Sequence, residues 1–530
     1  MIKTPKINLA DVKNPLEDLA GQFIIGESNF EAPPAWKTTA IGHFLVGCDP
    51  RLPVSILIDK SAPIAIFLGW PVHPELGSLS KLEHFGENLT DLGKSEEFEA
   101  FLNLLSGRFV AIHTGSKSGR FYLDASGSLS AVYCPSQKMI ASTPLLVPHS
   151  IDTDYDHELI NLSGVPYVEG WYPFGLTNRI GVHRLLPNHF LDLTTWASTR
   201  HWPQQSFNET SNIDANIKEI ASLIKRSISD SVADDGGLLA LTAGRDSRIL
   251  LACSREVLAK IQVFTAECDW SGYHGAVDID TARRITKRLN ITHIILPFQQ
   301  PTIRDYKMWT HRTGNCVGEL LGLRNIRTMN LLDQMPGVYL CGIASEVGRS
   351  RHWKEEDLDC QFIDIRELLN KIDLGKLQVI DRVIEEGEKW LAGLPRDCNT
   401  LLMLDLAHLE QKLGCWGGVA NYADIPLKRV HPFSQRRIFE LMLELPADFR
   451  FKQELTDKII ALEWPELLEF PYNEPIGLKM NVWRNLITIK QKGRFLLSKI
   501  LSRTPFLWRF NPGRSQHERT VSPISPDIFK

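Results

Sequence analysis

Several features that assign proteins to broad classes are missing from this sequence. Its nine cysteines are scattered and form no CxxC pair, which predicts reduced thiols rather than a disulfide framework. The N-terminal segment has no apolar stretch of signal-peptide length, and no uninterrupted apolar run is long enough to span a bilayer. The formal net charge is only −4, so it indicates no nucleic-acid or membrane partner. We therefore expect a cytoplasmic protein.

The length of the chain predicts two domains, because 530 residues exceed what one hydrophobic core usually supports. Residues 1–205 alternate short apolar runs with Gly and Ser turns, which is typical of an α+β domain. The polar segment 206–216 reads as a linker. From residue 217 to 485, apolar strands alternate with helical periodicity, beginning with a helix at 217–232, and the part beyond residue 360 is mostly helical. That pattern indicates a parallel sheet covered on both faces.

The C-terminal tail, residues 486–530, mixes Lys and Arg with aromatic and aliphatic side chains. It fits contact with a membrane surface or a partner. It also fits a terminal helix that docks by its apolar face, and we favour this second interpretation.

The strongest local signal is the segment Leu241–Arg248, LTAGRDSR, where the first parallel strand ends and a helix begins. Small residues at such a position let backbone N–H groups approach an anion, and the helix N-terminus adds partial positive charge. Asp246 would then hold Mg²⁺ that bridges phosphate oxygens. The alternative is that Asp246 and Ser247 merely cap the helix. No Gly-Lys-Ser/Thr follows, so the segment is not a Walker A loop.

In this context residues 242–247 resemble the SGGxDS pyrophosphatase loop of the asparagine synthetase-like ligases. Residues 263–265 (VFT) resemble the second strand, whose end contacts adenine in that family. Residues 340–346 (LCGIASE) resemble the LSGEGSDE segment, with Glu346 at the Asp that helps to hold Mg²⁺ and pyrophosphate. Further pieces resemble the family's glutaminase domain (107–109, Asp124 with Gly127, 132–133, 181–187, 202–203) and its PF…LP stretch (431–433, 445–446). Together they cover most of residues 40–475.

The resemblance implies an N-terminal glutaminase-like sandwich of the Ntn type, followed by a parallel-sheet ATP-pyrophosphatase domain with a helical extension. It implies ATP and Mg²⁺ as the bound groups. It assigns nucleotide binding to Leu241, Thr242, Ala243, Gly244, Arg245, Asp246, Ser247, Val263, Thr265 and Gly342, metal binding to Asp246 and Glu346, and catalysis to Glu346 and Lys479.

The sequence departs from the family pattern at four places. The family's N-terminal Cys nucleophile is absent, because residue 2 is Ile2 and the first cysteine, Cys48, lies inside an apolar segment. The catalytic Glu of the family falls on Ile343, which cannot deprotonate an amine. The family's late Lys falls near Asn473, with Lys479 as a substitute. Extra arginines surround the expected phosphate site: Arg245, Arg248, Arg349 and Arg351.

These features favour an AMP-forming ligase without glutaminase activity, which adenylates a small-molecule or peptide carboxylate and transfers it to ammonia or a substrate amine. β-Lactam synthetases and lasso-peptide cyclases are relatives of that kind. Asparagine synthesis from aspartate and a non-catalytic nucleotide-binding protein stay open as alternatives. A tRNA sulfurtransferase is disfavoured, because it needs a reactive cysteine and a basic RNA face. A homodimer is one candidate assembly.

Overall fold

The computed structural model describes residues 18–27, 30–59, 61–86, 91–115, 119–150, 154–268, 274–318, 320–360, 362–423 and 428–476. The chain divides into two compact units, Met1–Asn473 and Glu474–Lys530. The first unit carries every element discussed below. The second lies outside the described residues except for its first three, so Lys479 and the predicted tail 486–530 receive no structural description. The predicted domain boundaries stay a prediction.

Two β-sheets form the N-terminal part of the first unit. One has the strand order β13 (His183–Arg184), β10 (Val132–Cys134), β11 (Met139–Ala141), β1 (Phe23–Glu27), β3 (Phe44–Cys48), β2 (Lys37–Ile41). The other has the order β15 (Ser198–Arg200), β14 (His189–Asp192), β9 (Arg120–Leu123), β8 (Ser106–His113), β5 (Ala62–His73), β4 (Val54–Asp59), β7 (His84–Phe85), and β6 (Gly77–Ser78) pairs with β5. All named pairings are antiparallel except β4 with β7.

The two sheets pack face to face over a shared core, because side chains alternate between the faces of each strand. Ile25 and Val46 from the first sheet join Ile66 and Val110 from the second in one buried cluster. Phe67, next to Ile66, points to the opposite face, where it packs with aromatic side chains of α2 (Ser95–Leu104). The N-terminal part is thus a sandwich with a helix on one outer face.

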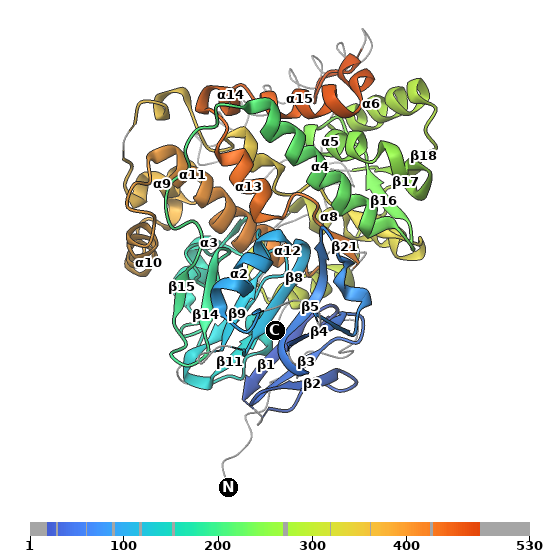
Figure 1. Cartoon of the computed structure of the whole chain (residues 1–530). Helices are drawn as coiled ribbons and strands as arrows, with labels where there is room; N and C mark the ends of the chain where they lie inside the picture. Colours follow the sequence, from blue (N-terminus) through green and yellow to red (C-terminus); the bar gives the residue numbers. More distant parts are fainter. Residues whose placement is uncertain are drawn as a thin grey trace, which may run out of the picture. The chain divides into compact units, whose positions relative to one another are not determined.

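A five-stranded parallel sheet organises the next part of the chain. Its strands are almost entirely apolar at the centre, since helices cover both faces. The order is β18 (His293–Leu296), β17 (Ile261–Ala266), β16 (Gly237–Ala240), β20 (Val338–Leu340), β21 (Arg429–Val430). Figure 1 shows the helices α4 (Ile213–Val232), α5 (Arg245–Cys253) and α6 (His274–Leu289) beside strands β16, β17 and β18. The predicted parallel sheet is therefore present, within a mixed α/β structure.

The helix α4 begins earlier than the sequence pattern predicts. We expected it from residue 217, whereas it begins at Ile213, because the side chain of Asn212 accepts a hydrogen bond from the amide of Ala215 at 3.1 Å. Such a cap satisfies a first-turn donor and favours helix formation there. The last part of the predicted linker is therefore the first turn of a helix.

Most of the remaining chain is helical. The helices are α3 (His157–Ser163), α7 (Ile303–Arg312), α8 (Leu320–Met329), α9 (Ile365–Lys371), α10 (Asp381–Ala392), α11 (Thr400–Ala407), the π-helix η10 (His408–Gly417), α12 (Gly418–Ala420), α13 (Arg436–Leu443), α14 (Ala447–Phe451) and α15 (Glu454–Glu463). The short strands β12 (Gly170–Trp171) and β19 (Val317–Gly318) pair with each other. Within the described ranges, no helix combines the length and apolar character that crossing a membrane requires.

The short helix α12, which directly follows η10, lies against the N-terminal sandwich. A Cβ atom at Gly418 would lie 2.1 Å from the carbonyl oxygen of Gly127, so only glycine permits this approach. Cys415, close by on η10, is fully enclosed, and burial raises the pKa of its thiol to about 11. Gly418, in the Trp-Gly-Gly sequence after Cys415, therefore serves close packing here, and the thiol is unsuited to nucleophilic chemistry.

Candidate functional site

The predicted phosphate loop follows the central strand of the parallel sheet. Leu241 continues β16 and its amide donates to the carbonyl of Phe264 at 2.8 Å. The chain then turns through Thr242 and Ala243 into α5, whose N-cap is Gly244. The loop thus lies at the carboxyl end of a parallel strand, which is where ligands of open α/β sheets bind.

Side-chain oxygens of the protein already engage three loop amides. The amide of Thr242 donates to Oγ of Ser247 at 3.1 Å, and the amide of Gly244 donates to Oγ1 of Thr242 at 3.1 Å. The amide of Ala243 donates to the carboxylate of Asp278, on α6, at 2.8 Å. An oxyanion therefore already sits on this loop. Because Gly244 has no side chain to cap α5, the first-turn amides of the helix add further donors.

A second segment brings its side chains to the same place. The hydroxyl of Ser345 and the guanidinium of Arg349, both on the short 3₁₀ helix η7 (Ser345–Arg349), donate to Oδ1 of Asp246. Gly342 allows this approach, since a Cβ atom there would lie 2.9 Å from Cβ of Asp246. The two motifs, about 100 residues apart in the sequence, therefore converge beside the loop.

Glu346 provides the second carboxylate of the site. Its side chain is half-buried, and its Oε2 atom is enclosed without a hydrogen-bond partner among the described residues. Burial and the charge of Asp246 raise the pKa of Glu346 to about 7, against the lowering effect of Arg349 and Arg351. An enclosed carboxylate oxygen without a donor is suited to receive a cation.

Asp246 and Glu346 fit a magnesium ion that is shared with phosphate oxygens. Mg²⁺ commonly takes one or two protein carboxylates and completes its shell with phosphates and water. The described residues contain no group of three or more His, Cys, Asp or Glu side chains placed to hold a metal by themselves. Two carboxylates beside a helix N-terminus suit an ion that arrives with a phosphate ligand.

Two of the extra arginines, Arg245 and Arg248, connect the loop to the segment 470–472. Arg248 is completely buried and donates to the carbonyls of Phe470, Pro471 and Ala243. Burial lowers its pKa to about 10. The guanidiniums of Arg248 and Arg245 lie 4.2 and 4.0 Å from the ring centroid of Tyr472. Both cations therefore bind segment 470–472 to the loop, whereas Arg349 faces Asp246 and Arg351 is exposed.

Asn473, near which the resemblance places the family's late Lys, contacts the same loop. Its amide donates to the carbonyl of Ala243 at 3.0 Å. Its Oδ1 atom is 3.8 Å from the place that a Cβ atom would take on Gly244. Lys479, the predicted substitute, lies outside the described residues.

The other two predicted nucleotide-binding residues have a different environment. The side chain of Val263 is fully enclosed in the core of the parallel sheet. The hydroxyl of Thr265 donates to the carbonyl of Leu241 at 2.7 Å and also contacts Nε2 of His293 at 2.9 Å. These two side chains support the loop from within the sheet, so any contact of theirs with a nucleotide would use the main chain.

Sequence analysis did not detect Asp278 as a partner of the loop. Asp278 lies 35 positions beyond Ala243, and nothing in the local sequence distinguishes a helix residue that reaches so distant a loop. Ser345 was visible as part of a motif, but its bond to Asp246 was not.

The N-terminal sandwich contains Cys48, the first cysteine of the sequence, as a free thiol. Ile2 lies outside the described residues. Cys48, on β3, is 1% exposed, and burial raises the pKa of its thiol to about 12. A thiol of that kind stays protonated and unreactive at neutral pH.

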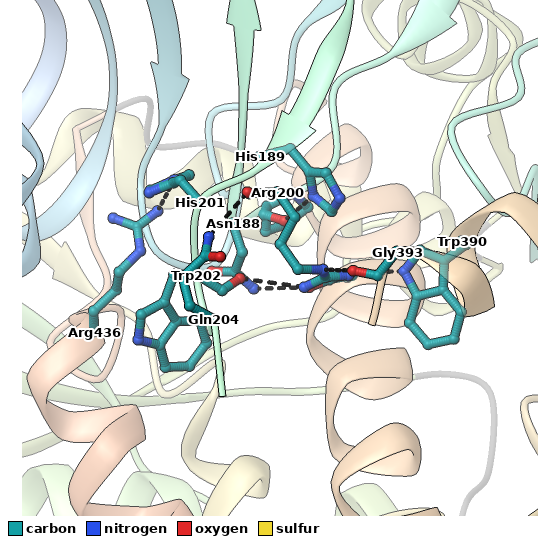
Figure 2. Close-up of polar contacts among 11 residues, drawn as sticks. Asn188, His189, Arg200, His201, Trp202, Gln204, Trp390, Gly393 and Arg436 are labelled. Carbon is teal, nitrogen blue, oxygen red and sulfur yellow. Dashed lines mark hydrogen bonds and ion pairs between the residues drawn. The ribbon is translucent and has the colours of Figure 1, made fainter. Parts of the chain in front are cut away.

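One wide groove lies away from the loop. It has a volume of about 710 Å³ and lies between β14, β15 and the segment that follows α10. Figure 2 shows Arg200 there, between Trp202 on one side and Gly393 with Trp390 on the other. Arg200 donates to both carboxylate oxygens of Glu410, at 2.5 and 2.7 Å. A further hollow of about 520 Å³ lies at the amino ends of the parallel strands, away from the ligand-binding edge.

Comparison with known proteins gives only distant similarities. No protein-family model matches the chain, and no curated protein matches it. Among solved structures, NMN synthetase from Francisella tularensis is 13% identical with a TM-score of 0.20, over 36% of this chain and 92% of that one. The NH3-dependent NAD synthetase from Campylobacter jejuni subsp. jejuni NCTC 11168 is 12% identical with a TM-score of 0.19, over 37% and 92%. The glutamine-dependent NAD+ synthetase from Acinetobacter baumannii is 12% identical with a TM-score of 0.18, over 46% and 50%.

Proposed function

We propose that this protein is an ATP-dependent ligase that adenylates a carboxylate, releases pyrophosphate and transfers the acyl group to an amine. The observation that carries the proposal is the meeting of Asp246 with Ser345 and Arg349, beside Glu346, at a loop of small residues and a helix N-terminus. Fixed donors and cations at such a site stabilise charge that develops on phosphate oxygens.

Each part of the site has a task in this proposal. The loop amides and the first turn of α5 hold the pyrophosphate end of ATP, which displaces Asp278 and the loop's own hydroxyls. Asp246 and Glu346 would hold Mg²⁺, which would neutralise phosphate charge. Arg349 moves from Asp246 to a phosphate oxygen, since a guanidinium pairs well with either group. The acyl donor is a small-molecule or peptide carboxylate, and the acceptor is ammonia or a substrate amine.

The decisive experiment is the exchange of radiolabelled pyrophosphate into ATP, measured across a panel of carboxylates that includes aspartate. Exchange with one carboxylate, lost in Asp246→Asn, is the expected result. Asp234→Asn is the matched control, because Asp234 is exposed, pairs with Lys81 and precedes β16 at the other edge of the sheet. If pyrophosphate exchange persists in D246N, then Asp246 is not part of the ATP site.

Asparagine synthesis is disfavoured by the side chains at two positions. Ile343 provides no proton acceptor, and Asn473 provides no cation where the family has Glu and Lys. We expect asparagine formation from aspartate, ATP and saturating ammonium chloride to be slower by about 100-fold or more than ordinary turnover of about one per second. Turnover at the ordinary rate would instead support asparagine synthesis as the function of the protein.

A nucleotide-binding protein without ligase activity is the second candidate. It is favoured by one observation, namely that Arg349 and the protein's own oxygens already occupy Asp246 and the loop amides. Binding of Mg·ATP without pyrophosphate exchange on any carboxylate would support it. The cytoplasmic location and the homodimer remain part of the proposal.

A further inference from the structure

A carboxylate lies on the inward-facing side of helix α6. Asp278 precedes Ala282 by four residues and Ile285 by seven residues in this helix. Residues at these spacings share one face of a helix, and Ala282 and Ile285 are fully buried in the core. Asp278, which is half-buried, thus continues an apolar stripe with a charged group. An inward-facing charge costs stability unless it is well partnered, so its contacts deserve an explanation.

One partner of Asp278 is the candidate phosphate loop. Its Oδ1 atom accepts a hydrogen bond of 2.8 Å from the amide of Ala243. A carboxylate oxygen and a phosphate oxygen are both anionic acceptors, and both form strong hydrogen bonds with a backbone N–H beside a helix N-terminus. The side chain of Asp278 therefore occupies a position that a phosphate oxygen would use.

The two neighbouring loop amides have partners of a different kind. The amide of Thr242 donates to Oγ of Ser247, and that of Gly244 donates to Oγ1 of Thr242, both at 3.1 Å. A hydroxyl is neutral and can turn its proton toward an incoming phosphate, so these partners do not oppose an anion. The carboxylate of Asp278 has the same sign of charge as a phosphate and has no proton to offer when it is ionised.

A phosphate group at the amide of Ala243 leaves two courses for Asp278. If the carboxylate stays, two like charges lie close together, which disfavours the complex. If the side chain turns away, its charge-assisted hydrogen bond to Ala243 is lost, and the new bond to phosphate only replaces it. In both cases the charge of Asp278 lowers the affinity of the loop for an anion.

Resting on the phosphate site of the proposed function, we propose that Asp278 is an internal competitor of pyrophosphate. Its carboxylate leaves the amide of Ala243 when the phosphate groups of ATP enter the loop. It returns to the same amide as pyrophosphate departs, so the product of adenylation is held less tightly than the loop alone would hold it. Asp278 acts through the loop and takes no part in bond making.

The test uses inorganic pyrophosphate as the probe, with its dissociation constant measured by titration calorimetry at one concentration of MgCl₂. Asp278→Asn keeps an oxygen that can accept from Ala243 but removes the charge, whereas Asp278→Ala removes both. We expect pyrophosphate to bind about tenfold more tightly to D278N than to the wild type, and at least as tightly to D278A as to D278N. Weaker or unchanged binding in either variant would overturn the inference, because Asp278 would then support the loop.

Asp280→Asn is the matched control, because Asp280 lies on the same helix and its carboxylate pairs with Arg284 at 2.8 Å. This variant removes the same charge from a side chain that is bonded elsewhere, so its pyrophosphate affinity should stay within about threefold of the wild type. An equal gain in D280N would assign the effect to the net charge of the helix and would overturn the role of Asp278.

Hydrogen exchange separates a vacated loop from a damaged one. Mass spectrometry of the segment 241–248 should show faster exchange in D278A than in the wild type, since the amide of Ala243 has lost its acceptor. Saturating pyrophosphate should restore the protection of this segment in D278A. Exchange that stays fast with pyrophosphate bound would show that the variant has lost the conformation of the loop, which would overturn the inference.

Failure of this inference and failure of the proposed function give different results. If neither the wild type nor any of the three variants binds pyrophosphate, then the phosphate site is wrong and both proposals fall. If D278N binds pyrophosphate more tightly but the protein exchanges none into ATP on any carboxylate, then the role of Asp278 stands and the ligase proposal is overturned. Normal exchange with unchanged pyrophosphate affinity in D278N would overturn this inference alone.

Discussion

Two glutamates, Glu346 at the candidate site and Glu410 beside the groove, have pKa values that are shifted in opposite directions. At Glu346 burial prevails and raises the pKa to about 7, and Oε2 has no hydrogen-bond partner among the described residues. At Glu410 burial acts in the same direction, but the charge and hydrogen bonds of Arg200 outweigh it, and the pKa is lowered. Asn188 and Trp390 donate to the same carboxylate, at 3.1 and 2.7 Å.

The difference separates a carboxylate that holds the structure from one that is available for binding. Every oxygen of Glu410 is engaged, and its bonds join β15 of the sandwich to η10 and to the end of α10. At Glu346, by contrast, Oε2 is enclosed without a partner in the described part of the chain, and an unsatisfied buried oxygen costs stability. Carboxylates with a strongly shifted pKa are frequent at functional sites, where a bound ligand can provide the missing partner. The following experiments would break or sharpen this comparison.

The largest expected effect is on stability, in Glu410→Gln. The substitution leaves Arg200 buried without its countercharge, which commonly costs about 3–5 kcal/mol. The free energy of unfolding, from urea denaturation, should fall accordingly. Glu386→Gln is the control, because Glu386 pairs with the well-exposed Lys389 at the same groove, and such surface pairs contribute about 0–1 kcal/mol. Equal losses in the two variants would contradict the structural role of Glu410.

The next largest effect is expected on Mg·ATP binding, in Asp246→Asn. Loss of the charge removes one of two proposed metal ligands, so affinity should fall roughly 100-fold, and each tenfold corresponds to about 1.4 kcal/mol. Isothermal titration with a non-hydrolysable ATP analogue, with and without Mg²⁺, measures it. If the affinity of the variant keeps its full Mg²⁺ dependence, then Asp246 is not a ligand of the metal.

A smaller effect is expected in Gly342→Ala. The new methyl group would lie 2.9 Å from Cβ of Asp246, so Asp246 must shift, and Mg·ATP affinity should fall about tenfold, in line with the usual cost of overpacking. Gly417→Ala is the control, because a Cβ atom there meets nothing within 4 Å. If the two variants bind equally well, then Asp246 does not need its present position.

The smallest effect is a pH dependence that Glu346→Gln should abolish. Because the folded protein raises the pKa of Glu346 to about 7, the stability it contributes is full below the ordinary glutamate pKa and declines as pH rises toward 7. Binding of Mg²⁺ with ATP needs the ionised form, so affinity should rise over the same window. Titrations between pH 5 and 8 measure both trends. A wild-type affinity that is flat across this window would contradict the role of Glu346.

Local patterns in the sequence anticipated a substantial part of this structure. The small residues of Thr242–Gly244 between an apolar strand and a helix predicted the loop, and the structure has a strand, a loop and a helix there. The pattern missed the start of α4, because the cap at Asn212 depends on a single polar side chain outside the apolar periodicity. The sequence grouped Arg248 with the arginines around the expected phosphate site, and only the structure shows that its guanidinium lies on Tyr472 and on carbonyls near residue 470.

By itself, the sequence determined the features that depend on neighbours along the chain. These are the apolar parallel strands, the loop of small residues, the position of Asp246 in the helix that follows the loop, and an isoleucine at residue 2. Only the tertiary structure decided which distant side chains meet. It placed Arg349 on Asp246, Asn473 on the loop, Arg200 on Glu410 and His352 on His408. The physical reason is that charge pairing and burial act through space, so the state of a carboxylate or an imidazole depends on groups that its own sequence neighbourhood does not contain.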